Sequence, residues 1–123
     1  MVNLKGNKVE KPWGSEIILT LTPKYAWKIL CIKKGHRLSL QYHDKKCETL
    51  MVCGGKVKVT LGGSEFVTDE DSDVIEIPPQ TPHRLEALED TVIFEVSTPE
   101  LNDVVRLADD YGRECKKDGQ IES

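Results

Sequence analysis

The amino-acid sequence predicts an all-β domain, built as a sandwich or a barrel. Eight or nine short runs of strand-forming residues follow one another, separated by glycine, proline and charged turns. The chain has 123 residues, and a domain of this size buries roughly two-thirds of its unfolded surface without a disulfide or metal staple. We therefore expect one domain over residues 1–123, ending in a polar tail at 114–123.

Turn residues bound the expected strands. Gly-Gly pairs at 54–55 and 62–63 provide tight turns, and a Pro-Pro pair at 78–79 interrupts the chain before the next run. In chain order, the expected strands cover residues 15–20, 26–33, 37–43, 48–53, 56–61, 65–68, 74–77, 84–88 and 91–96.

Alternation supports the individual strands, because successive side chains of a strand point to opposite faces. The apolar sets that share a face are Trp27, Ile29 and Cys31 in the second run, Val57, Val59 and Leu61 in the fifth, and Val92, Phe94 and Val96 in the last.

Only the C-terminal part of the chain shows helical spacing. Thr98 suits the N-cap of a helix, and Pro99 suits its first position. We therefore expect one short C-terminal helix that packs against the β-domain through an apolar face. The apolar residues at helical spacing are Leu101, Val104, Val105 and Ala108.

Charge and composition exclude some classes of partner. The chain has 17 basic and 21 acidic residues and a net charge of -4, which argues against general binding to nucleic acid or anionic membranes. No run approaches the roughly 18–20 apolar residues that span a bilayer. The lysine-rich start is not a secretory signal, so we expect a cytoplasmic protein with reduced cysteines.

Four residues have the chemistry of a metal site. Gln41 and His43 are two apart and share one face of an expected strand, Glu48 follows a charged turn, and His83 follows a proline-rich turn. Two imidazoles, a carboxylate and an amide oxygen suit a borderline or hard divalent ion. In a closed barrel these separated residues can meet inside.

The same residues resemble the two motifs of the cupin superfamily. The first motif corresponds to Gly35, Gln41-x-His43, Glu48 and Gly54-Gly55, and the second to Pro78 followed by His83. Gln41 stands where the first motif usually has a histidine. The resemblance implies a jelly-roll barrel of the double-stranded β-helix type.

A narrower resemblance covers residues 10–113. Five segments, in the family's order, look like the C-terminal cupin domain of type II mannose-6-phosphate isomerases, which often also carry a mannose-1-phosphate guanylyltransferase domain. They are 11–16 (KPWGSE), 38–43 (LSLQYH), 77–78 (IP), 82–86 (PHRLE) and 109–113 (DDYGR). The resemblance implies a divalent ion on Gln41, His43, Glu48 and His83. Zinc is the first expectation, with manganese, cobalt, nickel and iron as alternatives.

The expected activity is aldose–ketose isomerisation of a sugar phosphate such as mannose-6-phosphate. That reaction needs a Lewis acid, a base and cations for the phosphate. Arg106 lies in a segment that resembles one carrying an active-site arginine, and Lys46 replaces another arginine of the family. The expected catalytic residues are Arg106, Lys46 and Glu16, and the expected substrate-binding residues are Arg84, Arg113 and Glu86, with Glu16 and Glu86 both open as the base.

Two other functions fit the same residues. The first is a non-catalytic, metal-containing domain that binds a sugar or a sugar nucleotide. The second, ranked lower, is an iron oxygenase on His43, Glu48 and His83, against which Gln41 argues as a fourth ligand. In each case we expect a small-molecule ligand and a homodimer formed through sheet faces or edges, because open edges invite pairing.

Overall fold

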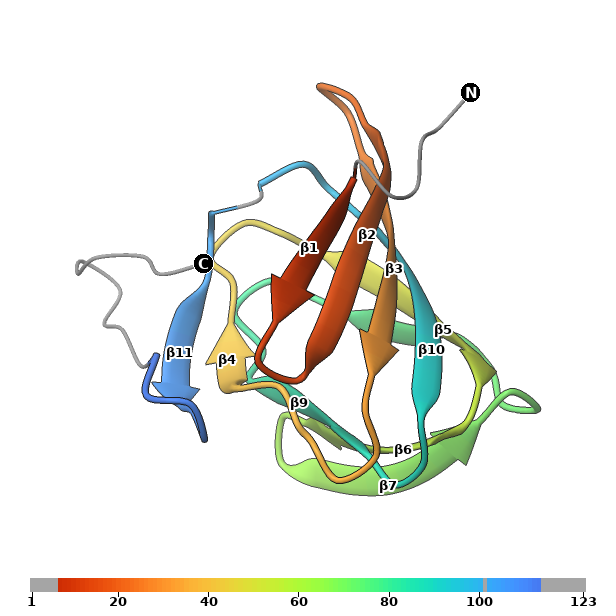
Figure 1. The fold of residues 1–123 in the computed structure, drawn as a ribbon. Coiled ribbons are helices and arrows are strands. Elements are labelled where there is room, and N and C mark those ends of the chain that lie inside the picture. Colours follow the sequence, from red (N-terminus) through yellow and green to blue (C-terminus); the bar gives the residue numbers. More distant parts are fainter. Residues whose placement is uncertain (1–6, 101, 114–123) are drawn as a thin grey trace.

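Two antiparallel β-sheets face each other in the computed structural model of the chain (Figure 1). Residues 7–100 and 102–113 are described. The strands are β1 (Lys8–Lys11), β2 (Gly14–Leu21), β3 (Ala26–Ile32), β4 (Leu40–Tyr42), β5 (Glu48–Gly54), β6 (Lys56–Leu61), β7 (Ser64–Asp69), β8 (Ile75–Ile77), β9 (His83–Ala87), β10 (Thr91–Ser97) and β11 (Val105–Ala108).

From β3 onward the chain passes from one sheet to the other with each new strand, except between β6 and β7. The six-stranded sheet has the order β1-β2-β3-β10-β5-β8, and the five-stranded sheet has the order β11-β4-β9-β6-β7. Strand β10 therefore pairs with β3 on one side and β5 on the other, although six strands separate it from β3 in the sequence. This arrangement confirms the all-β prediction, and it brings residues far apart in the chain to one interior.

The interior is polar at one end and apolar at the other. Along β5 the inward side chains change from Glu48 to leucine and valine, and along β9 they change from His83 to leucine and alanine. Strand β3 follows the same order from Lys28, whereas antiparallel β10 reaches its polar Glu95 after Ile93. The polar residues consequently gather at one level of the barrel.

Apolar packing at the other end holds the two sheets together. A cluster of buried side chains from both sheets fills this region, and removing such area from water is the main stabilising contribution to folding. Its members are Trp13, Leu30, Ile32, Leu50, Val52, Val57, Val59, Ile75, Ile77, Leu85, Ala87 and Ile93. The polar end of the interior thus lies next to a close-packed apolar core.

The predicted C-terminal helix is wrong. Val105–Ala108 form strand β11, which pairs with β4 and places Arg106 opposite Gln41; Leu101 lies outside the described residues. The β-branched pair Val104-Val105 favours extended backbone, and the free edge of β4 offers hydrogen bonds that a four-residue segment gains at once. Residues 7–100 and 102–113 contain no helix, and hence none that is long and apolar enough to cross a membrane.

In β10 the inward side chains are mostly polar, whereas the outward side chains are mostly apolar. Val92, Phe94 and Val96 do share a face, as predicted, but it is the outer face. The inner face carries Glu95 and Ile93, flanked by threonine and serine. The hydrophobic side of this strand therefore does not mark the core.

Candidate metal centre

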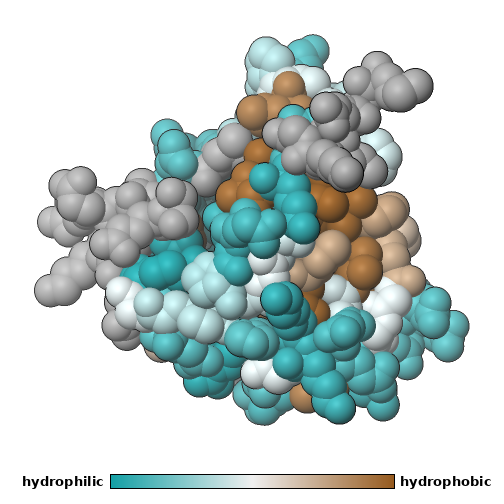
Figure 2. All heavy atoms as spheres, viewed as in Figure 1, coloured by the Kyte–Doolittle hydropathy of each residue, from teal (hydrophilic) through white to brown (hydrophobic). Residues whose placement is uncertain are grey.

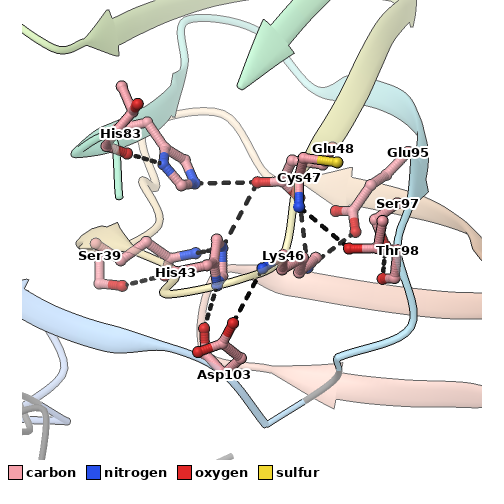
Figure 3. A network of polar contacts seen from close by, with 12 residues as sticks. Ser39, His43, Lys46, Cys47, Glu48, His83, Glu95, Ser97, Thr98 and Asp103 are labelled. Carbon is pink, nitrogen blue, oxygen red and sulfur yellow. Dashed lines mark hydrogen bonds and ion pairs between the residues drawn. The ribbon is translucent and has the colours of Figure 1, made fainter. Parts of the chain in front are cut away.

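Three buried side chains converge at the polar end of the barrel. His43 follows β4, Glu48 begins β5 and His83 begins β9, and one ligand atom from each lies within 4.8 Å of the other two. Glu48 Oε1 is 3.1 Å from His83 Nε2 and 3.6 Å from His43 Nε2. Figure 3 shows both imidazoles turned toward this carboxylate. The sequence prediction that these three residues meet is therefore matched by their placement.

Backbone carbonyls hold both imidazole rings from behind. His43 Nδ1 is 2.6 Å from the carbonyl oxygen of Asp103, and His83 Nδ1 is 2.9 Å from that of Thr81. A carbonyl only accepts hydrogen bonds, so each Nδ1 must carry the proton. In the neutral ring, Nε2 then presents its lone pair to Glu48, which is how protein histidines are oriented for a metal ion.

The donor set fits a divalent cation. Two imidazole lone pairs and a carboxylate oxygen are three acceptors at contact distance, and such a group is stable only around a shared cation or with protons added to both rings. Two histidines and one carboxylate are a common ligand set for zinc and for other first-row divalent ions. His43, Glu48 and His83 would hold the ion.

Lys46 holds the other oxygen of Glu48. Its Nζ lies 3.4 Å from Glu48 Oε2 and 3.2 Å from Glu95 Oε2, and all three side chains are almost completely buried. Oε1 is thereby left to face the histidines. The cation that we predicted as catalytic is thus engaged by two carboxylates of its own chain.

Burial and neighbouring charge act in opposite directions on these three groups. Burial disfavours ionised Glu48, but hydrogen bonds that His43 and His83 donate when Nε2 carries a proton, together with the Lys46 ammonium, hold the pKa of Glu48 well below its usual range. Burial likewise opposes the charge of Lys46, yet Glu95 and Glu48 raise the pKa of Lys46 above its ordinary value. Burial and the charge of Glu48 raise the pKa of Glu95.

Gln41 lies beside the three ligands and is held by Ser39. The Ser39 hydroxyl donates to Gln41 Oε1 at 2.5 Å, and Gln41 Nε2 is 3.4 Å from His43 Nε2. A hydroxyl can donate or accept, so the amide can turn over, keep its bond to Ser39 and direct its oxygen toward the centre. The geometry therefore suits Gln41 as a fourth ligand.

Asp103 organises the loop that carries His43. Its carboxylate accepts hydrogen bonds from the backbone N–H groups of Asp44, Lys45 and Lys46 at 3.1, 2.7 and 3.0 Å. Burial opposes the charge, but these three donors hold the pKa of Asp103 below its ordinary value. Because the carbonyl of Asp103 also receives His43, this one residue fixes both the loop and the imidazole.

The centre opens into a cavity of about 120 Å³ whose wall carries more cationic than anionic side chains. A buried water needs roughly 10–15 Å³ by this measure, so the cavity has room for roughly eight to twelve water-sized groups, such as an ion together with several ligand atoms. Five cationic and three carboxylate side chains line it: Lys11, Lys28, Lys46, Arg106, Arg113, Glu16, Glu48 and Glu95. Such a wall favours an anionic ligand.

The structure brings together most of the predicted site residues, but not all. Glu16 lines the cavity and is ion-paired with Lys28 at 3.1 Å, and Arg106 lines it from β11. Arg84 and Glu86 lie on the outward face of β9 and do not line the cavity. Arg84 instead donates to the backbone carbonyls of Leu38 and Ala108, which fastens β11 to the barrel.

The DDYGR segment at 109–113 packs against residues 36 and 37, which lie beside the Ala87 end of β9. Asp109 accepts two hydrogen bonds from the Arg113 guanidinium, and Asp110 forms a two-point ion pair with Arg37 at 2.7 and 2.8 Å. The Tyr111 hydroxyl lies 2.8 Å from His36 Nδ1. Arg113 lines the cavity, whereas His36, which contacts Tyr111, does not line it.

Comparison with known proteins gives the family. The sequence profile described as "Mannose-6-phosphate isomerase C-terminal" matches residues 3–109. The chain belongs to this family. The match runs from β1 through β11, so it includes His43, Glu48 and His83 and most of the cavity wall.

Similar curated proteins are much longer than this member of the family. The chain is 33% identical over 111 residues to mannose-1-phosphate guanylyltransferase of Escherichia coli (strain K12), covering 86% of the chain and 23% of that protein. It is 31% identical over 119 residues to alginate biosynthesis protein AlgA of Pseudomonas aeruginosa, covering 93% and 24%. The chain thus spans about a quarter of the length of the curated relatives it matches.

Solved structures confirm the cupin fold. KdgF from Halomonas sp. superposes with a TM-score of 0.72 at 21% identity, covering 80% of this chain and 91% of that one. An RmlC-like cupin from Shewanella frigidimarina superposes with a TM-score of 0.70 at 15% identity, covering 81% and 90%. At these identities the likeness shows the fold alone, a double-stranded β-helix.

Sequence reasoning missed four residues that shape this family member's site. Lys28 and Glu95 face each other in the register of β3 and β10. Lys28 is the lone charge in an otherwise apolar inward row, and Glu95 is the lone charge in an inward row that also carries threonine and serine. The sequence did indicate a role for Ser39, since Ser39 lies two residues from Gln41 and so shares its face of the strand. Asp103 had no such indication, because its role depends on a contact with residues nearly sixty positions away.

We predict that Asp103→Ala weakens metal binding by about 10–100-fold, the usual effect of removing a group that orients a metal ligand. The three N–H groups of 44–46 lose their acceptor, so the loop that presents His43 becomes less ordered. Isothermal titration of chelator-treated protein with Zn²⁺ measures the change. Asp110→Ala is the matched control, since Asp110 pairs with Arg37 outside the cavity. Equal affinities for the two variants would contradict the assignment.

We also predict that Lys46→Met lowers the free energy of unfolding by about 3–5 kcal/mol, because two buried carboxylates lose their shared cation. Adding Glu95→Gln to this variant should restore part of the loss. Urea unfolding followed by circular dichroism measures both values. Lys58→Met is the control, since its pair with Glu65 is exposed and should be worth at most about 1 kcal/mol. A loss no larger than that of the control would count against the buried triad.

Proposed function

We propose that this domain is a metal-dependent sugar-phosphate isomerase that interconverts mannose-6-phosphate and fructose-6-phosphate. The observation that carries the proposal is the junction of the His43–Glu48–His83 acceptor cluster with a cavity whose wall carries five cationic side chains and three carboxylates. One side of the cavity suits a metal ion and the other suits a phosphate. Membership of the mannose-6-phosphate isomerase C-terminal family supports the same reaction.

The proposed cofactor is zinc, held by His43, Glu48, His83 and the amide oxygen of Gln41. Imidazole nitrogens with a carboxylate are typical zinc ligands, although manganese, cobalt, nickel and iron share them. When bound, the ion would supply a Lewis acid for the carbonyl and hydroxyl oxygens of the sugar. Lys46 acts in this proposal by keeping Glu48 ionised and oriented, since it already contacts two carboxylates.

Glu16 is the proposed base. In the direction from aldose to ketose, its carboxylate takes the proton from C2 and returns it at C1, while a proton passes from the C2 hydroxyl to the C1 oxygen. Lys28 Nζ lies 3.1 Å from Glu16 Oε1 and holds this carboxylate at the cavity wall. Glu86, the other candidate for the base, lies on the outward face of β9, and we therefore do not assign it this role.

The phosphate is proposed to bind at Arg106 and Arg113. Both guanidinium groups line the cavity, and a planar guanidinium can give two parallel hydrogen bonds to a phosphate. Lys11 at the same wall adds charge, although burial lowers the pKa of Lys11. We place the reaction in the cytoplasm, as the sequence predicts.

One observation favours a second function, namely binding of a sugar or sugar nucleotide without turnover. Among the described cavity residues, each carboxylate contacts a cationic or imidazole group: Glu16 contacts Lys28, Glu95 contacts Lys46, and Glu48 contacts Lys46 and the histidines. A carboxylate held in an ion pair is a weaker base. The two functions share the metal and the anion-binding wall, and they differ in turnover.

We predict metal-dependent interconversion of mannose-6-phosphate and fructose-6-phosphate by the purified protein. His43→Ala should abolish both metal binding and turnover, and chelation should abolish turnover reversibly. Glu16→Gln should retain the metal but lose about 10²–10⁴-fold in kcat, the usual contribution of a general base. Glu86→Gln is the matched control and should keep the wild-type rate. A coupled assay that consumes fructose-6-phosphate, with metal content measured for each variant, gives these results.

The outcomes separate the two functions. Tight binding of mannose-6-phosphate by metal-loaded protein without turnover would reject the isomerase and support the binding domain. Turnover that Glu16→Gln leaves unchanged would reject Glu16 as the base.

A further inference from the structure

Asp109 is a buried carboxylate that contacts a cavity residue without lining the cavity itself. Its side chain is fully buried and accepts three hydrogen bonds from Arg113, from the backbone N–H at 2.6 Å, Nε at 3.0 Å and Nη2 at 3.1 Å. Burial opposes its charge, but these hydrogen bonds hold the pKa of Asp109 below its ordinary value. The described residues that line the cavity include Arg113 and do not include Asp109. The carboxylate therefore lies behind the guanidinium.

The two side-chain hydrogen bonds occupy one edge of the Arg113 guanidinium. Nε and Nη2 form that edge, and each meets a different oxygen of Asp109. A guanidinium has five N–H groups in one plane, so Nη1 and the second N–H of Nη2 form another edge for a second anion. The spacing of that edge matches two oxygens of a phosphate. Asp109 thus holds the guanidinium and leaves its end for a ligand.

Two neighbouring residues also hold the Arg113 side chain in this orientation. Its guanidinium carbon lies 5.5 Å from the centroid of the Tyr111 ring. That ring is itself fixed, because Tyr111 packs against the apolar core and its hydroxyl lies 2.8 Å from His36 Nδ1. Gly112 has a φ of 74°, which costs glycine little and turns the backbone N–H of Arg113 back to Asp109.

The segment 109–113 follows β11, the strand that carries the other arginine proposed to bind phosphate. The charge of Arg106 also contributes to the low pKa of Asp109, so the carboxylate lies within electrostatic range of both arginines. Figure 2 shows mainly hydrophilic or neutral colouring over the region of β11, whereas the hydrophobic colouring gathers over the region of β2, β3 and β10. This side of the molecule therefore suits a charged ligand.

We propose that Asp109 is a positioning residue for phosphate recognition, which directs the Nη1–Nη2 edge of Arg113 into the cavity. This inference rests on the proposed function, because it assigns the phosphate to Arg113. A free arginine side chain gives up rotamer freedom when it binds a ligand, whereas Arg113 has given it up already on folding. Asp109 also removes one net positive charge, which by itself would weaken binding of an anion. Four other cationic side chains line the cavity, so the ordering effect outweighs the charge effect.

Isothermal titration with mannose-6-phosphate and with mannose, in the presence of Zn²⁺, tests the proposal. Wild-type protein should bind mannose-6-phosphate more tightly than mannose. Asp109→Ala should weaken binding of mannose-6-phosphate by about 3–10-fold, the usual cost of ordering one long side chain, and leave the affinity for mannose unchanged. Asp110→Ala is the matched control, because it removes the same charge from the adjacent position, where the carboxylate pairs with Arg37. It should keep both wild-type affinities.

A double-mutant cycle separates positioning from a general effect on the fold. Arg113→Ala should lose most of the preference for the phosphorylated sugar, and adding Asp109→Ala to it should cause no further loss. Far-UV circular dichroism checks that each variant is folded. Asp109→Asn keeps the size of the side chain with a single acceptor oxygen. It should show a smaller loss in the same direction, and it replaces the alanine variant if that variant fails to fold.

Four results would overturn the proposal. Tighter binding of mannose-6-phosphate by Asp109→Ala would show that Asp109 acts through its charge. Equal losses in Asp109→Ala and Asp110→Ala would show a general effect, and a further loss in the Arg113→Ala background would show that Asp109 acts through another group. Equal wild-type affinities for the two sugars would remove the phosphate site itself. The expected binding results without turnover would reject the isomerase and support the role of Asp109, so the two proposals fail separately.

Discussion

The buried carboxylate of Glu48 is the constraint on which the polar half of this protein depends. One of its oxygens faces two imidazole nitrogens, and the other faces the Lys46 ammonium, which stabilises the ionised form. A lone buried carboxylate would take up a proton or destabilise the fold. The neighbouring contacts support this arrangement: Asp103 and Thr81 orient the histidines through their carbonyls, and Glu95 is a second carboxylate partner of Lys46. The site is therefore a connected network in which each group fixes the next.

The barrel can contain this polar network because its apolar half provides most of the stability of the fold. Buried ion pairs contribute little net stability, since the loss of hydration offsets most of their attraction. The apolar half, from Trp13 to Ile93, supplies the burial that keeps the sheets together. The same division appears within single strands, where one step of two residues along β5 or β9 passes from a ligand to a core leucine. A shift of register by one residue would remove the ligand and the core residue together.

Much of this organisation could be predicted from the sequence, for reasons that particular residues illustrate. The strands were predictable where turns and alternation agree, as at 56–61. The meeting of Gln41, His43, Glu48 and His83 was predictable because they carry metal-binding chemistry in the order of a known family. The final helix was predicted wrongly, because the spacing of Val104, Val105 and Ala108 fits a helix as well as a strand, and only the free edge of β4 decides. Arg84 and Glu86 were chosen by type of residue, whereas strand parity turns them away from the cavity. Lys28, Glu95 and Asp103 depend on contacts between distant segments, which no local pattern contains.

The central claim is that a divalent ion binds among the nitrogen and oxygen atoms of Gln41, His43, Glu48 and His83. X-ray absorption spectroscopy of zinc-loaded protein tests it most directly, because it reports which atoms surround the ion. The account predicts one ion per chain with two imidazole nitrogens and oxygen ligands at about 2.0–2.2 Å, and no sulfur. A shell containing sulfur at about 2.3 Å would place the ion on a cysteine, and a shell of oxygens without imidazole would place it outside this centre. Either result would contradict the account.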